Sequence, residues 1–295
     1  MVSGATAVAR QGRPRRRRWR VPQGLFVQLG LVVGGFAIAL PFLFVVTTSL
    51  KADGEWFGDP YSWFPAAPTL GNYAQVLALD EPRRWALNTA VVVAVSLMGS
   101  LISCSLVAYS LARLRFKGRD AVFSLIVATL MLPGQVLLIP QYILFAKLGW
   151  VDTPLPLTVP AFFALNAFYV FFLRQYFRSI PRELEEAMLV DGAGRLTILR
   201  RLIVPLSTPA FAVIAIIHVV GTYNDFFNPF IYLHAADHLT LAVGMATVNQ
   251  IIPGVRSIPK EMAATVLFVL PLIVIYLVLH RRITDAVEAG AGVKG

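Results

Sequence analysis

The sequence predicts an all-α membrane protein with six transmembrane helices. Of its 295 residues 57% are hydrophobic and only 14% are charged, and the mean hydropathy is +0.68. An ordinary soluble domain has about 25% charged residues, so a water-soluble globular protein is excluded. A helix needs about 20 apolar residues to cross a bilayer. The uncharged stretches that meet this need are 21–50, 85–112, 121–146, 153–173, 202–224 and 262–280.

Two further uncharged stretches, 60–79 and 239–255, are predicted to lie outside the bilayer. The first contains three prolines, which remove backbone donors that lipid cannot replace. The second is short and contains Asn249 and Gln250. Both are better explained as interfacial or external segments than as spans.

The positive charges are divided unequally between the two sides of the predicted membrane. Twenty of the 26 Lys and Arg residues fall in the tail 1–20, the connections 113–119 and 174–201, and the end beyond residue 280. Because Lys and Arg gather on the cytoplasmic side, both termini are predicted to be cytoplasmic. The net charge of +10 is therefore an orientation signal. Residues 1–20 are interpreted as a basic tail beside anionic lipid, with no nucleic-acid partner.

The second span carries a small residue at every fourth position on one helical face. Such a face lets another helix approach closely in lipid. Cys104, one of these residues, is the single cysteine of the chain, which excludes an intrachain disulfide and any cysteine-based metal cluster. The face consists of Ser96, Ser100, Cys104, Ala108 and Ala112.

Prolines interrupt the third and fifth spans. Pro133 and Pro140 in the third span free backbone carbonyls, which is consistent with a packed kink or with a pore-lining role. Pro205 and Pro209 are expected to kink the fifth span where it enters the membrane.

A polar group, 222–225, closes the fifth span where it approaches the outer face. An acidic residue at mid-bilayer costs about 3 kcal/mol and normally faces protein or water, but the cost is lower near the interface. Asp225 therefore fits a solvated helix end as well as a gate. With Asn224 and Asn228 it is a candidate for the outer mouth of a translocation path.

The connection 174–205 alternates apolar and charged residues, and a cytoplasmic partner is expected to bind there. Pro181 suits the first turn of a short helix, whose positive end would be stabilised by Glu183 and the two glutamates that follow it. Gly192 can end this helix in the left-handed conformation. Ala187 and Met188 are expected to present an apolar surface to a cleft in another protein.

A second short helix is predicted from about Arg195 into Pro205. The two helices would meet at the glycine turn and lie against the membrane. The apolar residues on one side of the second helix are Leu196, Leu199, Leu202 and Ile203.

This connection resembles the EAA signature of ABC importer permeases, the inner-membrane subunits of binding-protein-dependent transport systems. The matching residues are Glu186-Ala187-Met188, then Gly192 after three further residues, then Val204-Pro205. Met188 departs from the pattern, because a second alanine is usual there. Met188 is larger and more flexible than alanine, which affects only how closely it would fit its cleft.

Other fragments resemble the maltose-type, carbohydrate branch of that family, and the resemblance covers nearly the whole chain after the tail. They are Asn72-Tyr73, the run Ala108–Arg113, Ile180-Pro181, Asn224-Asp225-Phe226 and Gly292–Gly295.

The resemblance implies the type I ABC importer permease fold over 21–295, with a core permease domain at about 84–281 and a coupling-helix loop at 174–205. It implies a multi-pass inner-membrane subunit that works with a second homologous permease, an ATP-binding subunit dimer, an extracytoplasmic substrate-binding protein and a sugar or related polyol. The residues it implies for ATPase docking are Glu185, Glu186, Ala187, Met188, Asp191, Gly192 and Ala193.

No catalytic, cofactor or metal motif is found in the chain. It has no phosphate-binding P-loop, and the match of 290–295 to G-x-G-x-x-G opens no helix. His234 and His238 are four apart, and solvated histidines are favoured over a metal pair. We therefore expect a transport subunit rather than an enzyme, with ATP hydrolysed on a separate chain.

Two alternatives from other classes remain. One is an ATP-independent secondary transporter or channel subunit, which would not need the 182–205 loop. The other is a membrane-embedded enzyme, for which His218 and Asp225, two helical turns apart, are the available intramembrane pair.

Overall fold

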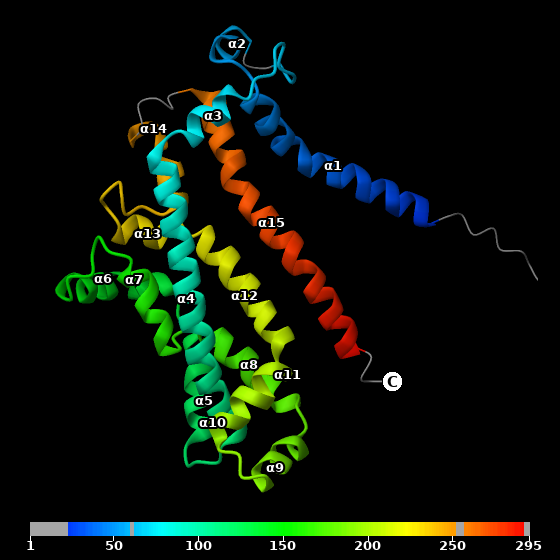
Figure 1. Cartoon of the computed structure of the whole chain (residues 1–295), viewed down its shortest axis with the longest axis vertical. Helices are drawn as coiled ribbons and strands as arrows, with labels where there is room; N and C mark the ends of the chain where they lie inside the picture. Colours follow the sequence, from blue (N-terminus) through cyan, green and yellow to red (C-terminus); the bar gives the residue numbers. More distant parts are fainter. Residues whose placement is uncertain (1–22, 60–61, 252–256, 292–295) are drawn as a thin grey trace, which may run out of the picture. The chain divides into compact units, whose positions relative to one another are not determined.

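A computed structural model describes residues 23–59, 62–251 and 257–291, and its regular structure in these ranges is entirely helical (Figure 1). The predicted basic tail 1–20 and the terminal Gly292–Gly295 lie outside the described residues. The chain divides into two units, Met1–Phe44 and Val45–Gly295. The first helix, α1 (Gln23–Ser49), crosses this division.

The predicted spans correspond to helices of membrane-crossing length and composition. Among the described residues, four stretches qualify singly, and two bent pairs of helices bring the number to six if each pair is one span. The all-α polytopic class is therefore confirmed. The single stretches are Val27–Ser49, Asp80–Arg113, Leu155–Ser179 and Ile258–Leu277, and the pairs are Arg119–Thr129 with Gly134–Lys147 and Arg195–Leu206 with Thr208–Tyr223.

Helix α4 (Asp80–Arg113) is the central element of the second unit. It packs against α8 (Ala167–Ser179), α12 (Thr208–Tyr223) and the short connectors α7 (Leu155–Thr158) and η2 (Val159–Phe163). All five members of its small-residue face are buried, so the predicted close packing is confirmed.

The third predicted span is broken rather than merely kinked. It consists of α5 (Arg119–Thr129), the 3-10 turn η1 (Gly134–Leu137) and α6 (Leu138–Lys147), and its two halves are bent by 93°. Pro133 lies in extended conformation at the break and has no N–H to continue the helical hydrogen bonds.

The fifth predicted span is bent by 76° at its entry. It begins with α10 (Arg195–Ile198), the π-helical turn η3 (Leu199–Ile203) and α11 (Val204–Leu206), followed by α12. The predicted prolines flank the bend. Of the apolar residues predicted on one side of this segment, Leu199 and Ile203 are buried, whereas Leu196 is 61% exposed. Ile198 is buried as well.

The fourth predicted span ends later than expected. Helix α8 continues to Ser179, so Arg174 lies in the helix and not in the connection that follows it. Arg174 is buried; its guanidinium lies over the Phe123 ring at 3.7 Å, and its Nε donates to the Leu111 carbonyl. These partners compensate a charge that hydropathy alone assigns to a loop.

The last span is the first part of α15 (Ile258–Ala291). The shorter helices outside the spans are α2 (Asp53–Gly58), α3 (Gly71–Leu77), α9 (Arg182–Val190), α13 (Phe227–Tyr232) and α14 (Leu241–Ile251). Of these, α3 and α14 lie in the stretches predicted to be outside the bilayer, 60–79 and 239–255, and neither qualifies as a span among the described residues.

Candidate functional site

Helices α9 and α10 form an elbow, residues 182–198, at the end of α4 opposite α3 and α14 (Figure 1). Pro181 precedes α9 in extended conformation, and Asp191 ends it. Gly192 has φ +80°, the left-handed conformation predicted for it, and its N–H donates to the Leu189 carbonyl. Helix α10 begins at Arg195 as predicted.

The exposed surface of the elbow is largely apolar, although the segment that forms it contains many charged residues. Val190 is 88% exposed, and Leu184, Ala187 and Leu196 are also exposed. Contiguous exposed apolar side chains of this kind mark a protein or membrane contact. The sequence prediction named Ala187 but missed Leu184 and Val190, which lie three residues before and after it on the same helical face.

The turn of the elbow gathers most of the residues predicted for docking. Met188, Asp191, Gly192 and Ala193 border a hollow of about 440 Å³ together with Arg201. Glu186 is exposed and Met188 is half-buried. A partner side chain can therefore reach the backbone of the turn as well as the apolar face of α9.

Glu185 alone among the predicted docking residues is buried. Its Oε1 lies 2.9 Å from Nε of Arg113, and the two side chains are only 7% and 3% exposed. The contact is an ion pair, and neither of these two atoms makes a hydrogen bond within the described part of the chain. Glu185 therefore faces α4 and is not part of the exposed surface.

Arg113 also binds the end of α8. Its Nη2 donates to the carbonyls of Phe177, at 2.5 Å, and Ile180, at 2.6 Å. The Arg113 guanidinium, at the end of α4, thus contacts α8, Ile180 directly after α8, and α9. Sequence reasoning used Arg113 for the topology of the chain and for the family resemblance, but predicted no partner for it.

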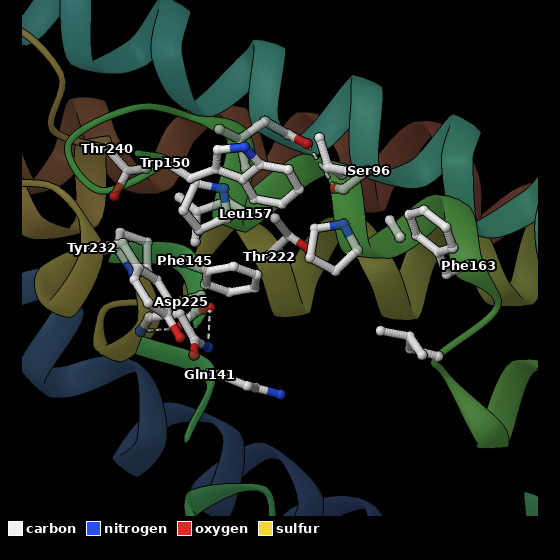
Figure 2. Close-up of a pocket in the computed structure, with 18 of the residues that line it drawn as sticks. Ser96, Gln141, Phe145, Trp150, Leu157, Phe163, Thr222, Asp225, Tyr232 and Thr240 are labelled. Carbon is white, nitrogen blue, oxygen red and sulfur yellow. Dashed lines mark hydrogen bonds between the residues drawn. The ribbon is translucent and has the colours of Figure 1, made fainter. Parts of the chain in front are cut away.

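A cleft of about 460 Å³ lies farther along α4, toward the side predicted to be extracytoplasmic. It is bounded by α4, α6, α7, η2, α12 and α13. Figure 2 shows aromatic rings and the Asp225 carboxylate together at one end and Phe163 at the other. The polar residues that line it are Thr89, Ser96, Gln141, His218, Thr222, Asp225, Asn228 and Thr240.

Three aromatic side chains pack together in the wall of the cleft. The ring centroids of Phe145 and Trp150 are 5.5 Å apart, and those of Phe145 and Tyr232 are 5.4 Å apart. Phe145 and Tyr232 are buried and Trp150 is half-buried, and all three line the cleft together with Asp225 and Asn228. This is the usual make-up of a site for a small organic ligand. The sequence prediction missed these rings, because they come from three different segments.

Asp225 and Asn228 both line the cleft, whereas Asn224 is not among its lining residues. The Asp225 carboxylate accepts hydrogen bonds from the Asn228 backbone N–H, at 3.2 Å, and from its side-chain amide, at 2.8 Å. Asp225 therefore caps the start of α13. Asn224 donates back to the Val220 carbonyl of α12 at 2.8 Å.

His218 lines the same cleft and joins two of its walls. Its Nε2 is 2.8 Å from Oγ of Ser96 on α4, and its Nδ1 is 3.4 Å from the Tyr169 hydroxyl on α8. Asp225 lies beyond the end of α12, so it shares no helical face with His218, although both residues line the cleft. His218 is held by hydroxyl groups, and the described residues contain no group of three or more metal-binding side chains.

The loop beside the cleft is held by Asp152. Its carboxylate accepts hydrogen bonds from the backbone N–H groups of Ala235 and His234, both at 2.9 Å, and lies 3.2 Å from Nδ1 of His238. The bond from Ala235, followed by that from His234, holds the pKa of Asp152 below its usual value. His238 thus faces a carboxylate.

Comparison with known proteins gives a consistent match. Residues 101–288 match the family model described as "Binding-protein-dependent transport system inner membrane component". The chain is 30% identical over 270 residues to the arabinooligosaccharides transport system permease protein AraQ of Halalkalibacterium halodurans, covering 90% of this chain and 95% of the relative. It is also 30% identical over 270 residues to the trehalose/maltose transport system permease protein MalG of Thermococcus litoralis, covering 88% and 95%.

A solved structure has the same fold. It is a chain of a bacterial ABC transporter involved in the import of the acidic polysaccharide alginate. The TM-score is 0.79 at 24% sequence identity, and the match covers 91% of this chain and 99% of that chain.

Proposed function

Since this chain belongs to the family of inner membrane components of binding-protein-dependent transport systems, we propose that it carries an oligosaccharide or related polyol through the cleft and docks its ATPase at the elbow. The chain is an inner-membrane permease subunit of an ABC importer, not an enzyme. Relatives named for arabinooligosaccharide and trehalose or maltose transport support a carbohydrate substrate.

The exposed apolar surface of the elbow is the observation that carries this proposal. Val190 and Leu196 are mostly exposed on a segment that the charge distribution places on the cytoplasmic side, and exposed apolar side chains at such a place are expected to contact a partner. An ATP-binding subunit with an apolar groove is the partner expected of an ABC permease. Glu186 and Asp191 at the rim of this surface would pair with basic residues of that subunit.

The cleft supports a sugar as the substrate. Sugar rings have apolar C–H faces, which stack on aromatic rings, and hydroxyl groups, which pair with carboxylates and amides. Phe145, Trp150 and Tyr232 supply the first kind of contact, and Asp225 and Asn228 supply the second. A second homologous permease and an extracytoplasmic binding protein complete the proposed complex.

Gly192→Pro tests docking at the elbow. Proline cannot adopt φ +80° and loses the N–H that binds Leu189. The chain should still insert in the membrane, but uptake of labelled oligosaccharide should fall to background and the ATPase subunit should no longer co-purify. The control is Gly194→Ala, where φ is negative and the added Cβ meets nothing within 4 Å. Normal uptake by an inserted Gly192→Pro chain would contradict the assignment.

Asp225→Ala and Trp150→Ala test the cleft. Either change should raise the KM for uptake by about tenfold, the effect of losing about 1.4 kcal/mol of binding, with ATPase co-purification unchanged. Asn224→Ala, a neighbour outside the cleft, is the matched control and should leave the KM unaltered. Equal effects of all three changes would reject the cleft as the path. Asp225→Asn keeps the cap of α13 and separates a lost charge from a lost fold.

A further inference from the structure

The buried contact between Arg113 and Glu185 is not explained by docking. The exposed face of α9 provides the proposed ATPase surface, whereas Glu185 points away from it, toward α4. Two charged side chains that are each less than one-tenth exposed have lost most of their hydration, and a buried pair of this kind is weak evidence for stability. A role in connecting the elbow to α4 accounts for its place.

Regular α-helix is interrupted on both sides of the elbow, between the elbow and the membrane helices. Toward α12 the chain passes through the π-helical turn η3 and a 76° bend. Toward α8 the helix is interrupted at Pro181, which is not helical. Hinge movements are absorbed by a few residues at the ends of such elements. Arg113 spans the interruption at Pro181, because it binds Glu185 of α9 and the carbonyls at the end of α8 simultaneously, and it joins both to α4.

Helix α4 connects this contact with the cleft. It is one helix of 34 residues, about 50 Å long at 1.5 Å per residue. Val92 and Ser96 on α4 line the cleft, and Ser96 binds His218 on the opposite wall. A displacement of Arg113 is therefore transmitted along a continuous helix to the wall of the proposed sugar path.

We propose that the Arg113–Glu185 ion pair is the link by which the elbow moves α4 and thereby opens or closes the cleft. Both are positioning residues: they touch neither substrate nor ATPase. The inference rests on the proposed function, since it assumes that an ATPase moves the elbow. It assigns the transmission of movement from the elbow to α4 to this one buried contact, and not to the docking surface as a whole.

The test uses the complete complex of this chain with its partner permease and ATPase subunits in lipid nanodiscs. Glu185→Ala and Glu185→Gln remove the charge but leave Arg113 bound to the α8 carbonyls. Glu183→Ala, an exposed glutamate two residues earlier on α9, is the matched control. Three quantities are measured: co-purification of the ATPase, basal ATP hydrolysis, and its stimulation by sugar-loaded binding protein.

We expect the Glu185 variants to keep the ATPase subunit and the basal rate but to lose stimulation by 5- to 150-fold, the usual range of coupling between sites. Glu183→Ala should be stimulated like the native chain. A merely structural role would reduce co-purification and both rates together. Normal stimulation in the Glu185 variants would overturn the inference. Absence of stimulation in the native complex would instead overturn the proposed function.

A distance measurement keeps the inference testable if the variants do not assemble. Spin labels at Glu183 on α9 and Leu106 on α4, both exposed, are placed in the otherwise native complex with Cys104→Ser. If the ion pair joins the two helices, their separation should be the same without nucleotide and with trapped nucleotide. A separation that changes between these states would overturn the inference.

Discussion

The ion pairs at the two ends of α4 differ in their exposure to solvent. At the outer end, Arg83 pairs with Asp80 and Arg84 pairs with Asp237, and all four side chains are at least half exposed. At the inner end, Arg113 and Glu185 are buried. Exposed pairs contribute about 0 to 1 kcal/mol and rearrange easily, whereas a buried charge that loses its partner is costly. The outer end can therefore adapt to a partner, while the inner end is fixed to the elbow.

The largest predicted effect comes from removing the inner cation. Arg113→Ala leaves Glu185 charged and buried without its partner and should lower the free energy of unfolding by about 3 to 5 kcal/mol. Arg84→Ala at the outer end should cost at most about 1 kcal/mol. Thermal unfolding of the two variants in the same detergent measures the difference. Similar losses would show that the two ends do not differ as described.

A smaller effect is predicted from packing at the outer end. Trp85 is fully buried, and its indole N–H donates to the Ala236 carbonyl. A Cβ added at Gly244 would collide with the Trp85 ring, so Gly244→Ala should destabilise the protein by about 1 to 3 kcal/mol.

Gly221→Ala is the matched control for this change. It lies in α12, and the added Cβ meets nothing within 4 Å, so it should be neutral or stabilising by up to about 1 kcal/mol. Equal unfolding midpoints for the two alanine variants would mean that packing around Trp85 does not hold the outer end.

The smallest predicted effect concerns pH at the outer loop. The pKa of Asp152 is lowered from its usual value of 3.8, so the contribution of its carboxylate to folding is present above pH 3.8 and is lost as the pH falls through the lowered pKa. The amides of His234 and Ala235 should therefore keep their hydrogen-exchange protection, corrected for intrinsic rates, from pH 8 to pH 5. Loss of protection already near pH 6 would contradict the assignment of the loop's order to the Asp152 carboxylate.

Sequence reasoning predicted the elements that depend on local signals. Gly192 in the left-handed conformation, the start of α10 at Arg195 and the buried small-residue face of α4 follow from spacing and residue type along one segment. The bend at Pro205 and Pro209 was also predicted, although not the angle. The coincidence of six apolar stretches with spans follows from length and composition alone.

Features that depend on partners distant in the chain were missed. The inward position of Glu185 depends on Arg113, 72 residues earlier, and the buried Arg174 depends on Phe123 and Leu111. Both residues are charged, so periodicity places them at the surface. The aromatic wall of the cleft combines Phe145, Trp150 and Tyr232, which become neighbours only after the broken third span is folded. A signal for the ion pair was available in the sequence. An arginine ends one span, and a glutamate lies on the side of the following cytoplasmic helix that faces this span.

The most direct test of the central claim is uptake of labelled oligosaccharide into vesicles that contain the native complex, with binding protein outside and with or without ATP inside. With the ATPase on the elbow and the sugar in the cleft, on opposite sides of the membrane, we expect uptake only when ATP is present on the elbow side and binding protein is present on the other side. Uptake at the same rate without ATP would contradict the account and favour a secondary transporter or channel.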